Sequence, residues 1–123
     1  MKKLFRKWAA YFVTAYANRT FRNAIKVADS WQGGTHKRHY VITDPNDDRK
    51  LVTIDTEGFL EMRHALGIRS KDLPISHLKN TCWYYTPNNE GRDVIPAREL
   101  VIRRLAFVRD RLNAAGLLDK KEE

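Results

Sequence analysis

The stretch RHYVITDPNDDRKLVTID, residues 38–55, has the pattern of a β-hairpin. Residues 38–43 and residues 51–55 alternate side chains in the period-two pattern of a half-buried strand. Residues 44–50 between them are mostly strong turn formers, so we predict a loop longer than the tightest hairpin turns. Residues 82–86, CWYYT, are either a third strand or the end of a preceding helix.

Two short helices are predicted after the hairpin. Residues 57–66 form the first, because an acidic residue lies near the positive N-terminal end and Gly67 follows as a stop. The second has Pro74 in its first turn, and either Ser70 or Asp72 can cap it.

The last helix is predicted to begin at Pro96 and to end at Gly116. Apolar residues recur along it every three to four positions, which predicts one buried stripe. This predicted stripe contains Ala97, Val101, Leu105, Val108, Leu112 and Ala115.

Residues 4–28 contain no Gly or Pro and predict a long helix that Gly33 and Gly34 end. Its apolar residues form two stripes, which are Phe5, Trp8, Phe12 and Tyr16 in the first half and Phe21, Ala24, Ile25 and Ala28 in the second. At about 100° per residue, the second stripe is rotated by roughly half a turn from the first. Either the helix therefore breaks near residues 18–20, or one stripe packs on the body while the other meets a partner.

Together these patterns predict a small single domain of the α+β class. We divide the chain into a basic N-terminal helical arm at 1–28, an α+β body at 35–118 and a charged tail at 119–123. The predicted core contains Tyr40, Ile42, Val52, Ile54, Phe59, Leu66, Leu78, Val101, Leu105, Val108 and Leu112.

Composition indicates a globular protein, because 42% of the 123 residues are hydrophobic and 31% are charged. The single cysteine, Cys82, excludes an internal disulfide and is typical of a reducing compartment. Residues 1–17 resemble a secretory signal, but two tyrosines and a threonine make the apolar part poorly hydrophobic. We therefore expect a cytoplasmic protein, or a virion-associated one if its origin is a phage.

The formal net charge of +8 is concentrated in the arm, where no Asp or Glu occurs. Residues 29–123 hold 16 Lys and Arg against 15 Asp and Glu. The cationic side chains of the arm are Lys2, Lys3, Arg6, Lys7, Arg19, Arg22 and Lys26. Such a segment predicts an anionic partner, and we expect it to contact the backbone of DNA or RNA. Trp8, Tyr11 and Tyr16 could stack on unpaired bases.

Two other partners fit the same arm. In a structural, assembly or adaptor protein, the stripe of Phe5, Trp8, Phe12 and Tyr16 would dock on a protein partner or on a second copy of the chain. An anionic membrane is the third possibility, because a basic helix with aromatic residues can lie at a bilayer surface. We do not expect a membrane partner, since the body offers no second lipid-anchoring signal.

A calcium loop is the most tempting metal motif, because residues 44–55 place oxygen ligands at positions one, three, five and twelve. Arg49 occupies the position where that loop needs Gly, and the last ligand is Asp55 rather than a bidentate Glu. We therefore interpret the segment as an Asp- and Asn-rich turn.

The spacing of the candidate residues supports neither a zinc site nor a catalytic site. The candidate zinc ligands are His36, His39, His64, His77 and Cys82, and they include no second cysteine to form a recognisable pair. No catalytic motif accompanies the combination of Cys82 with His77 or His64. The same is true of the carboxylate pair Asp55 and Glu57. We predict a non-enzymatic protein without catalytic residues, metal or cofactor.

The central block resembles a group of known sequences. Its residues 37–42 (KRHYVI), residues 50–55 (KLVTID), Phe59, Arg63 and residues 83–86 (WYYT) are similar to small uncharacterised proteins encoded by phages and conjugative elements of gut anaerobes. The resemblance covers about half of the chain and consists of structural positions. It implies a mobile-element or virion context without implying an activity.

Overall fold

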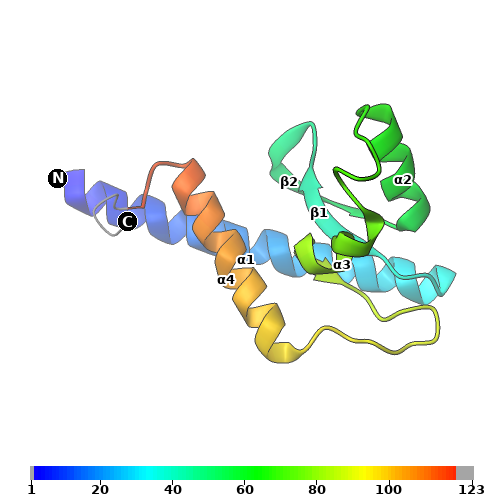
Figure 1. The fold of residues 1–123 in the computed structure, drawn as a ribbon. Helices are drawn as coiled ribbons and strands as arrows, with labels where there is room; N and C mark the ends of the chain where they lie inside the picture. Colours follow the sequence, from blue (N-terminus) through cyan, green and yellow to red (C-terminus); the bar gives the residue numbers. More distant parts are fainter. Residues whose placement is uncertain (1, 119–123) are drawn as a thin grey trace.

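The computed structural model describes residues 2–118 and has an α+β fold, which confirms the predicted class (Figure 1). Its elements are α1 (Lys2–Thr35), β1 (Tyr40–Asp44), β2 (Asp47–Ile54), α2 (Thr56–Ala65), the 3₁₀ helix η1 (Ile75–His77), α3 (Leu78–Thr81), β3 (Tyr84–Tyr85) and α4 (Ala97–Ala114). The predicted tail, 119–123, lies outside the described residues.

Three antiparallel strands form the sheet in the order β2-β1-β3. Tyr40 in β1 lies opposite Ile54 in β2 and opposite Tyr85 in β3. Of the two possibilities for residues 82–86, the third strand is therefore correct. The Trp83 indole N–H donates a 2.9 Å hydrogen bond to the Thr43 hydroxyl and joins β3 to β1.

The hairpin turn is tighter than the sequence predicted. Asp44 pairs with Asp47, so only Pro45 and Asn46 connect the two strands. The register shifts between Thr43 and Asp44, and this irregularity accommodates residues 48–50 within β2. The predicted long loop is wrong because the register shift places residues 47–50 in β2.

Helix α1 is continuous over 34 residues, so of the two alternatives the break near residues 18–20 is wrong. The predicted stop at Gly33 and Gly34 is also wrong, because both lie inside the helix. The helix ends at Thr35, and His36 follows it with a left-handed φ of 59°. The Thr35 hydroxyl donates a 2.8 Å hydrogen bond to the Trp31 carbonyl and satisfies one acceptor of the last turn.

The short helices follow the prediction with different caps. The Asp55 carboxylate accepts a 2.8 Å hydrogen bond from the backbone N–H of Gly58 and caps α2. At η1, Pro74 takes the N-cap position without a side-chain hydrogen bond. Neither predicted cap is used there, and Asp72 pairs with Arg69 instead.

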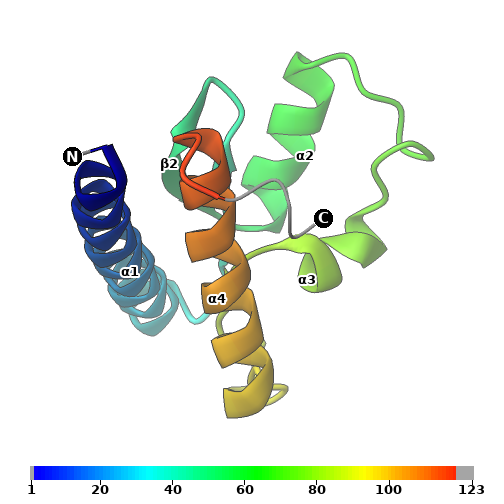
Figure 2. The same ribbon diagram turned by 90° about the vertical axis from the view of Figure 1, so that its left-hand side faces the viewer.

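Two apolar clusters make up the core. One lies around the sheet and includes Val41, Phe59 and Tyr85, each at most 3% exposed. The other lies where α1 and α4 cross and contains Ala17, Phe21, Phe107 and Val108 (Figures 1 and 2). Trp83 connects them, since its ring packs edge-on against Phe107 at 5.3 Å.

Three predicted core residues are exposed: Leu66 at 49%, Val101 at 45% and Leu105 at 56%. Leu66 follows the last turn of α2, where the chain turns away at Gly67 with a φ of 69°. Val101 and Leu105 lie on the outer side of α4.

Helix α4 is rotated from its predicted orientation because arginines take part of its inner side. The Arg103 guanidinium donates hydrogen bonds of 3.1 and 2.9 Å to the carbonyl oxygens of Lys79 and Cys82. Arg104 likewise reaches the Asn18 side chain in α1 at 3.0 Å. Half-buried arginines with satisfied hydrogen bonds can therefore replace apolar residues on a packed face.

Candidate functional site

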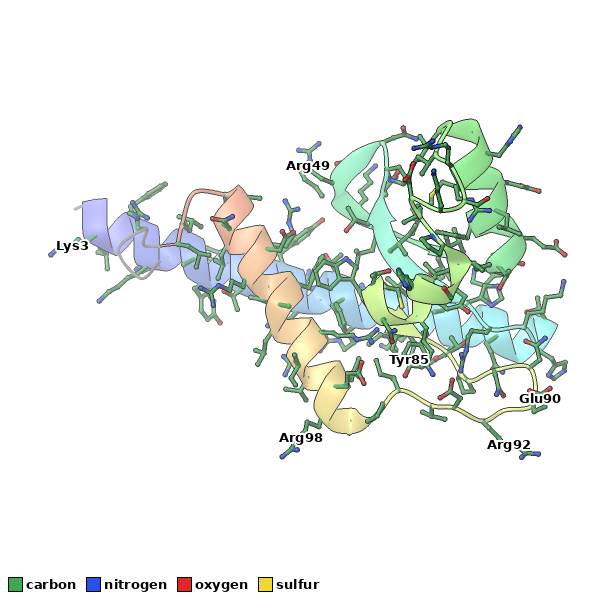
Figure 3. The ribbon with its side chains drawn as sticks, in the orientation of Figure 1. Lys3, Arg49, Tyr85, Glu90, Arg92 and Arg98 are labelled. Carbon is green, nitrogen blue, oxygen red and sulfur yellow. The ribbon has the colours of Figure 1, made fainter. Side chains whose placement is uncertain are left out.

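The N-terminal half of α1 carries an exposed apolar surface that we call the aromatic face. It projects beyond the sheet, at the end of the molecule marked by Lys3 in Figure 3. Its members are Leu4, Phe5, Trp8, Tyr11, Phe12 and Tyr16, and they are 60 to 74% exposed. The rings of Tyr11 and Phe12 meet edge to face at 5.7 Å.

Helix geometry explains why this face has no partner in the described chain. Trp8 precedes Ala17 by nine residues, and Phe12 precedes Phe21 by the same number. Nine residues are about two and a half helical turns, so the earlier residue of each pair lies on the opposite side of the helix. Ala17 and Phe21 are each 1% exposed against the body. A straight α1 that buries them must turn Trp8 and Phe12 away from the body.

The aromatic face is hollowed on both sides of Trp8. One hollow of about 500 Å³ runs along Phe5, Ala9 and Phe12, and another of about 350 Å³ runs along Lys7 and Tyr11. A third hollow of about 290 Å³ lies between α1, α4 and β2, beneath Phe12 and Tyr16. Trp8 is therefore a ridge between two apolar grooves, a shape that another apolar surface can interlock with.

The structure divides the cationic residues of the arm between two sides of α1. Lys3, Arg6 and Lys7 precede Phe21, Ala24 and Ile25 by 18 residues. That spacing is about five full turns, so these three cations lie on the side that faces the body. Arg6 confirms the placement, because its guanidinium donates a 3.2 Å hydrogen bond to the carbonyl of Gly116 at the end of α4.

The remaining three cations, Arg19, Arg22 and Lys26, are exposed on the outward side. Lys26 follows Trp8 by 18 residues and is in line with it. Within residues 2–118, none of these three side chains makes a hydrogen bond or an ion pair. The outward side of α1 is thus aromatic over its first half and cationic over its second. The side chain of Lys2 lies outside the described part of the chain.

Sequence reasoning missed a second cationic cluster, which surrounds the buried ring of Tyr85. Figure 3 labels Tyr85. The charged groups of Arg38, Lys79 and Arg103 lie 5.0 to 5.4 Å from the ring centroid. Asp93 pairs with Lys79 at 2.6 Å and with Arg38 at 3.0 Å, and hydrogen bonds from these two cations lower its pKa. Arg103 pairs with Glu99 in α4, so two carboxylates offset the three cations within the fold. We therefore interpret the cluster as structural.

The other candidate groups are placed by the fold as follows. Residues 44–54 of the considered calcium loop lie in the hairpin, and Asp55 caps α2. Cys82 is buried, and this burial raises the pKa of its thiol. Across residues 2–118, no three His, Cys, Asp or Glu residues are grouped to hold a metal ion. Over the same residues, no helix combines the length and apolarity that crossing a membrane requires.

No family model, curated protein or solved structure matches this chain. The aromatic face and the outward cations are consequently the features from which function is inferred.

Proposed function

We propose that this chain is a non-enzymatic assembly or adaptor protein that docks on a protein partner through the aromatic face of α1. The observation that carries the proposal is the exposure of the six large apolar side chains on the projecting half of one helix. At about 150–250 Å² per aromatic side chain, they expose on the order of 700 Å². The largest apolar patch on a typical monomer is about 300–600 Å² and often functional.

The spacing of the aromatic residues matches a known docking mode. Phe5, Trp8, Phe12 and Tyr16 follow the three- and four-residue steps of a helix that lays one side into an apolar groove. Trp and Tyr are also the residues that most often dominate the free energy of such interfaces. A mobile-element or virion context, which the central block implies by resemblance, stays a prediction and suits an assembly protein.

Photo-crosslinking in living cells tests the proposal. A benzophenone amino acid replaces Trp8 in one variant and Trp31 in a matched control, since Trp31 lies on the same helix with 57% exposure against 60%. We expect position 8 to yield a discrete protein adduct and position 31 to yield none. If position 8 forms adducts only with lipid or nucleic acid, or forms none, the proposal fails.

A second candidate function is supported by the row of Arg19, Arg22 and Lys26. These side chains are exposed along one side of α1 at intervals of three and four residues, and residues 1–28 contain no acid to neutralise them. Such a row can follow the phosphates of DNA or RNA without reading their sequence. Replacing all three with Gln should abolish binding to a fluorescent oligonucleotide at low salt. The matched control replaces Lys3, Arg6 and Lys7 and should retain binding.

A further inference from the structure

We infer that the partner of the aromatic face is a second copy of this chain, bound with its α1 antiparallel to the first. This inference rests on the proposed function, because it names the protein that covers the same face. The two can fail separately, since the face could bind a different protein.

The aromatic face is self-complementary about a two-fold axis. If that axis crosses α1 between residues 10 and 11, Phe5 of one copy lies opposite Tyr16 of the other. The same axis places Trp8 of each copy near Phe12 of its partner. Each Trp8 ridge then enters one of the grooves that flank the equivalent ridge on the other copy. One patch serving both copies in this way is the defining property of an isologous dimer.

Repulsion between the outward cations of the two copies favours the antiparallel direction. In a parallel pair, Arg19, Arg22 and Lys26 of one helix would face the same cations of the other, and like charges at such close range repel. In the antiparallel pair, residues 2–19 of the two α1 helices overlap, and the whole aromatic face lies within that overlap. Of the three outward cations, only Arg19 then lies beside the partner helix, opposite its residue 2. Arg22 and Lys26 then lie beyond the end of the partner helix, where solvent surrounds them.

The body does not obstruct this arrangement. The buried positions of α1 begin at Ala17 and lie on the side opposite the aromatic face. The antiparallel overlap therefore directs the two bodies toward opposite ends of the dimer.

The available area is close to what a stable interface needs. The aromatic face exposes on the order of 700 Å² in each copy, and a standard protein interface buries about 800 Å² per partner. The third hollow, beside Phe12 and Tyr16, adds further apolar surface at the edge of the contact.

Sedimentation velocity of the full chain tests the association. We expect a species of twice 14.4 kDa for the native sequence and for Trp31→Ser, and a monomer for the double variant Trp8→Ser/Phe12→Ser. As a control, the circular dichroism spectrum of the double variant should match that of the native sequence, which would show that the variant remains folded. A native chain that stays monomeric at its highest attainable concentration overturns the inference. In that case a crosslink from position 8 to a different protein would still support the proposed function.

A spin-label distance tests the direction of the helices in the dimer, with the aromatic face intact. The nitroxide replaces exposed Asn23 in a Cys82→Ser background, so that only the introduced thiol reacts. The antiparallel pair separates the two Asn23 positions by roughly 40 Å, at 1.5 Å of rise per residue. A parallel pair brings them to roughly 10 Å, the spacing of packed helices. The short distance, or no measurable coupling between labels, overturns the antiparallel dimer.

Discussion

The hydroxyl of Tyr84 donates a 2.7 Å hydrogen bond to the carboxylate of Asp29 and so ties the C-terminal third of α1 to β3. Asp29 is the first acidic residue of the chain. Together with the packing of Ala17 and Phe21 at the crossing with α4, this contact fixes the rotation of the whole helix. Because α1 is continuous, the same rotation turns the aromatic face away from the body.

Replacing Tyr84 with Phe should lower the free energy of unfolding by about 1 kcal/mol, the net value of a typical hydrogen bond. Burial, and then the hydrogen bond to Asp29, raise the pKa of Tyr84 above its ordinary value. The stability from this group is therefore present below about pH 10, the ordinary pKa of an unfolded tyrosine, and is lost as the pH rises from there toward the raised pKa of the folded state. Urea titrations at neutral and alkaline pH should show this loss in the native sequence and a smaller one in the variant.

The two apolar stripes of α1 should respond differently when one phenylalanine side chain in each is truncated. Phe21→Ala should lower the free energy of unfolding by about 3–5 kcal/mol, because it empties a buried position between α1 and α4. Phe12→Ala should change it by no more than about 0.5 kcal/mol in dilute monomeric protein, because that side chain is exposed. Similar losses in both variants would show that the aromatic face is part of the core.

The glycines within α1 offer a stabilising change. A Cβ added at Gly33 or Gly34 meets no atom within 4 Å, and both residues lie inside the helix. Each Gly→Ala replacement should raise the free energy of unfolding by up to about 1 kcal/mol, since Ala is the better helix former. Thermal melting measures the gain. A lower melting temperature would contradict a helix that continues through this segment.

The inner side of α4 depends on an arginine. Arg103→Met should lower the free energy of unfolding by about 1.5–3 kcal/mol, because it removes charged hydrogen bonds to the carbonyls of Lys79 and Cys82. Arg98→Met changes an exposed arginine of the same helix and should stay within about 0.5 kcal/mol of the native value. If both replacements lower the free energy of unfolding equally, the hydrogen bonds of Arg103 do not stabilise the fold.

The division of the arm's cations sets the salt dependence of any binding to nucleic acid. If only Arg19, Arg22 and Lys26 reach duplex phosphates, the logarithm of affinity should fall with the logarithm of salt concentration at a slope of about −3. If all seven cations take part, the slope should be about −6. Fluorescence anisotropy across a salt series distinguishes the two values.

Much of this architecture could be predicted from local sequence patterns. The period-two alternation of residues 38–55 identified the hairpin, and the half-turn rotation between the stripes of α1 held in the structure. The stripe of α4 was misplaced because its inner side depends on Arg103 and Arg104. Their acceptors, Cys82 and Asn18 among them, are distant in the sequence.

The candidate site was only partly predictable. The sequence identified the aromatic stripe of Phe5, Trp8, Phe12 and Tyr16, but it left open whether that stripe packs on the body. Contacts between residues distant in the sequence, such as Phe21 with Phe107 and Asp29 with Tyr84, determine which side of α1 is buried. The separation of Arg6 from Arg19 onto different sides could have been found from their spacing, given a continuous helix.

Hydroxyl-radical oxidation of Trp8 in living cells, compared with Trp31 in the same molecules, tests most directly whether a partner covers the aromatic face. The two tryptophans are almost equally exposed in the isolated chain, so dilute purified protein should show similar rates for both. We expect Trp8 to be oxidised several times more slowly than Trp31 in cells. Equal rates in cells would show that the aromatic face stays open to solvent and would contradict a docking function.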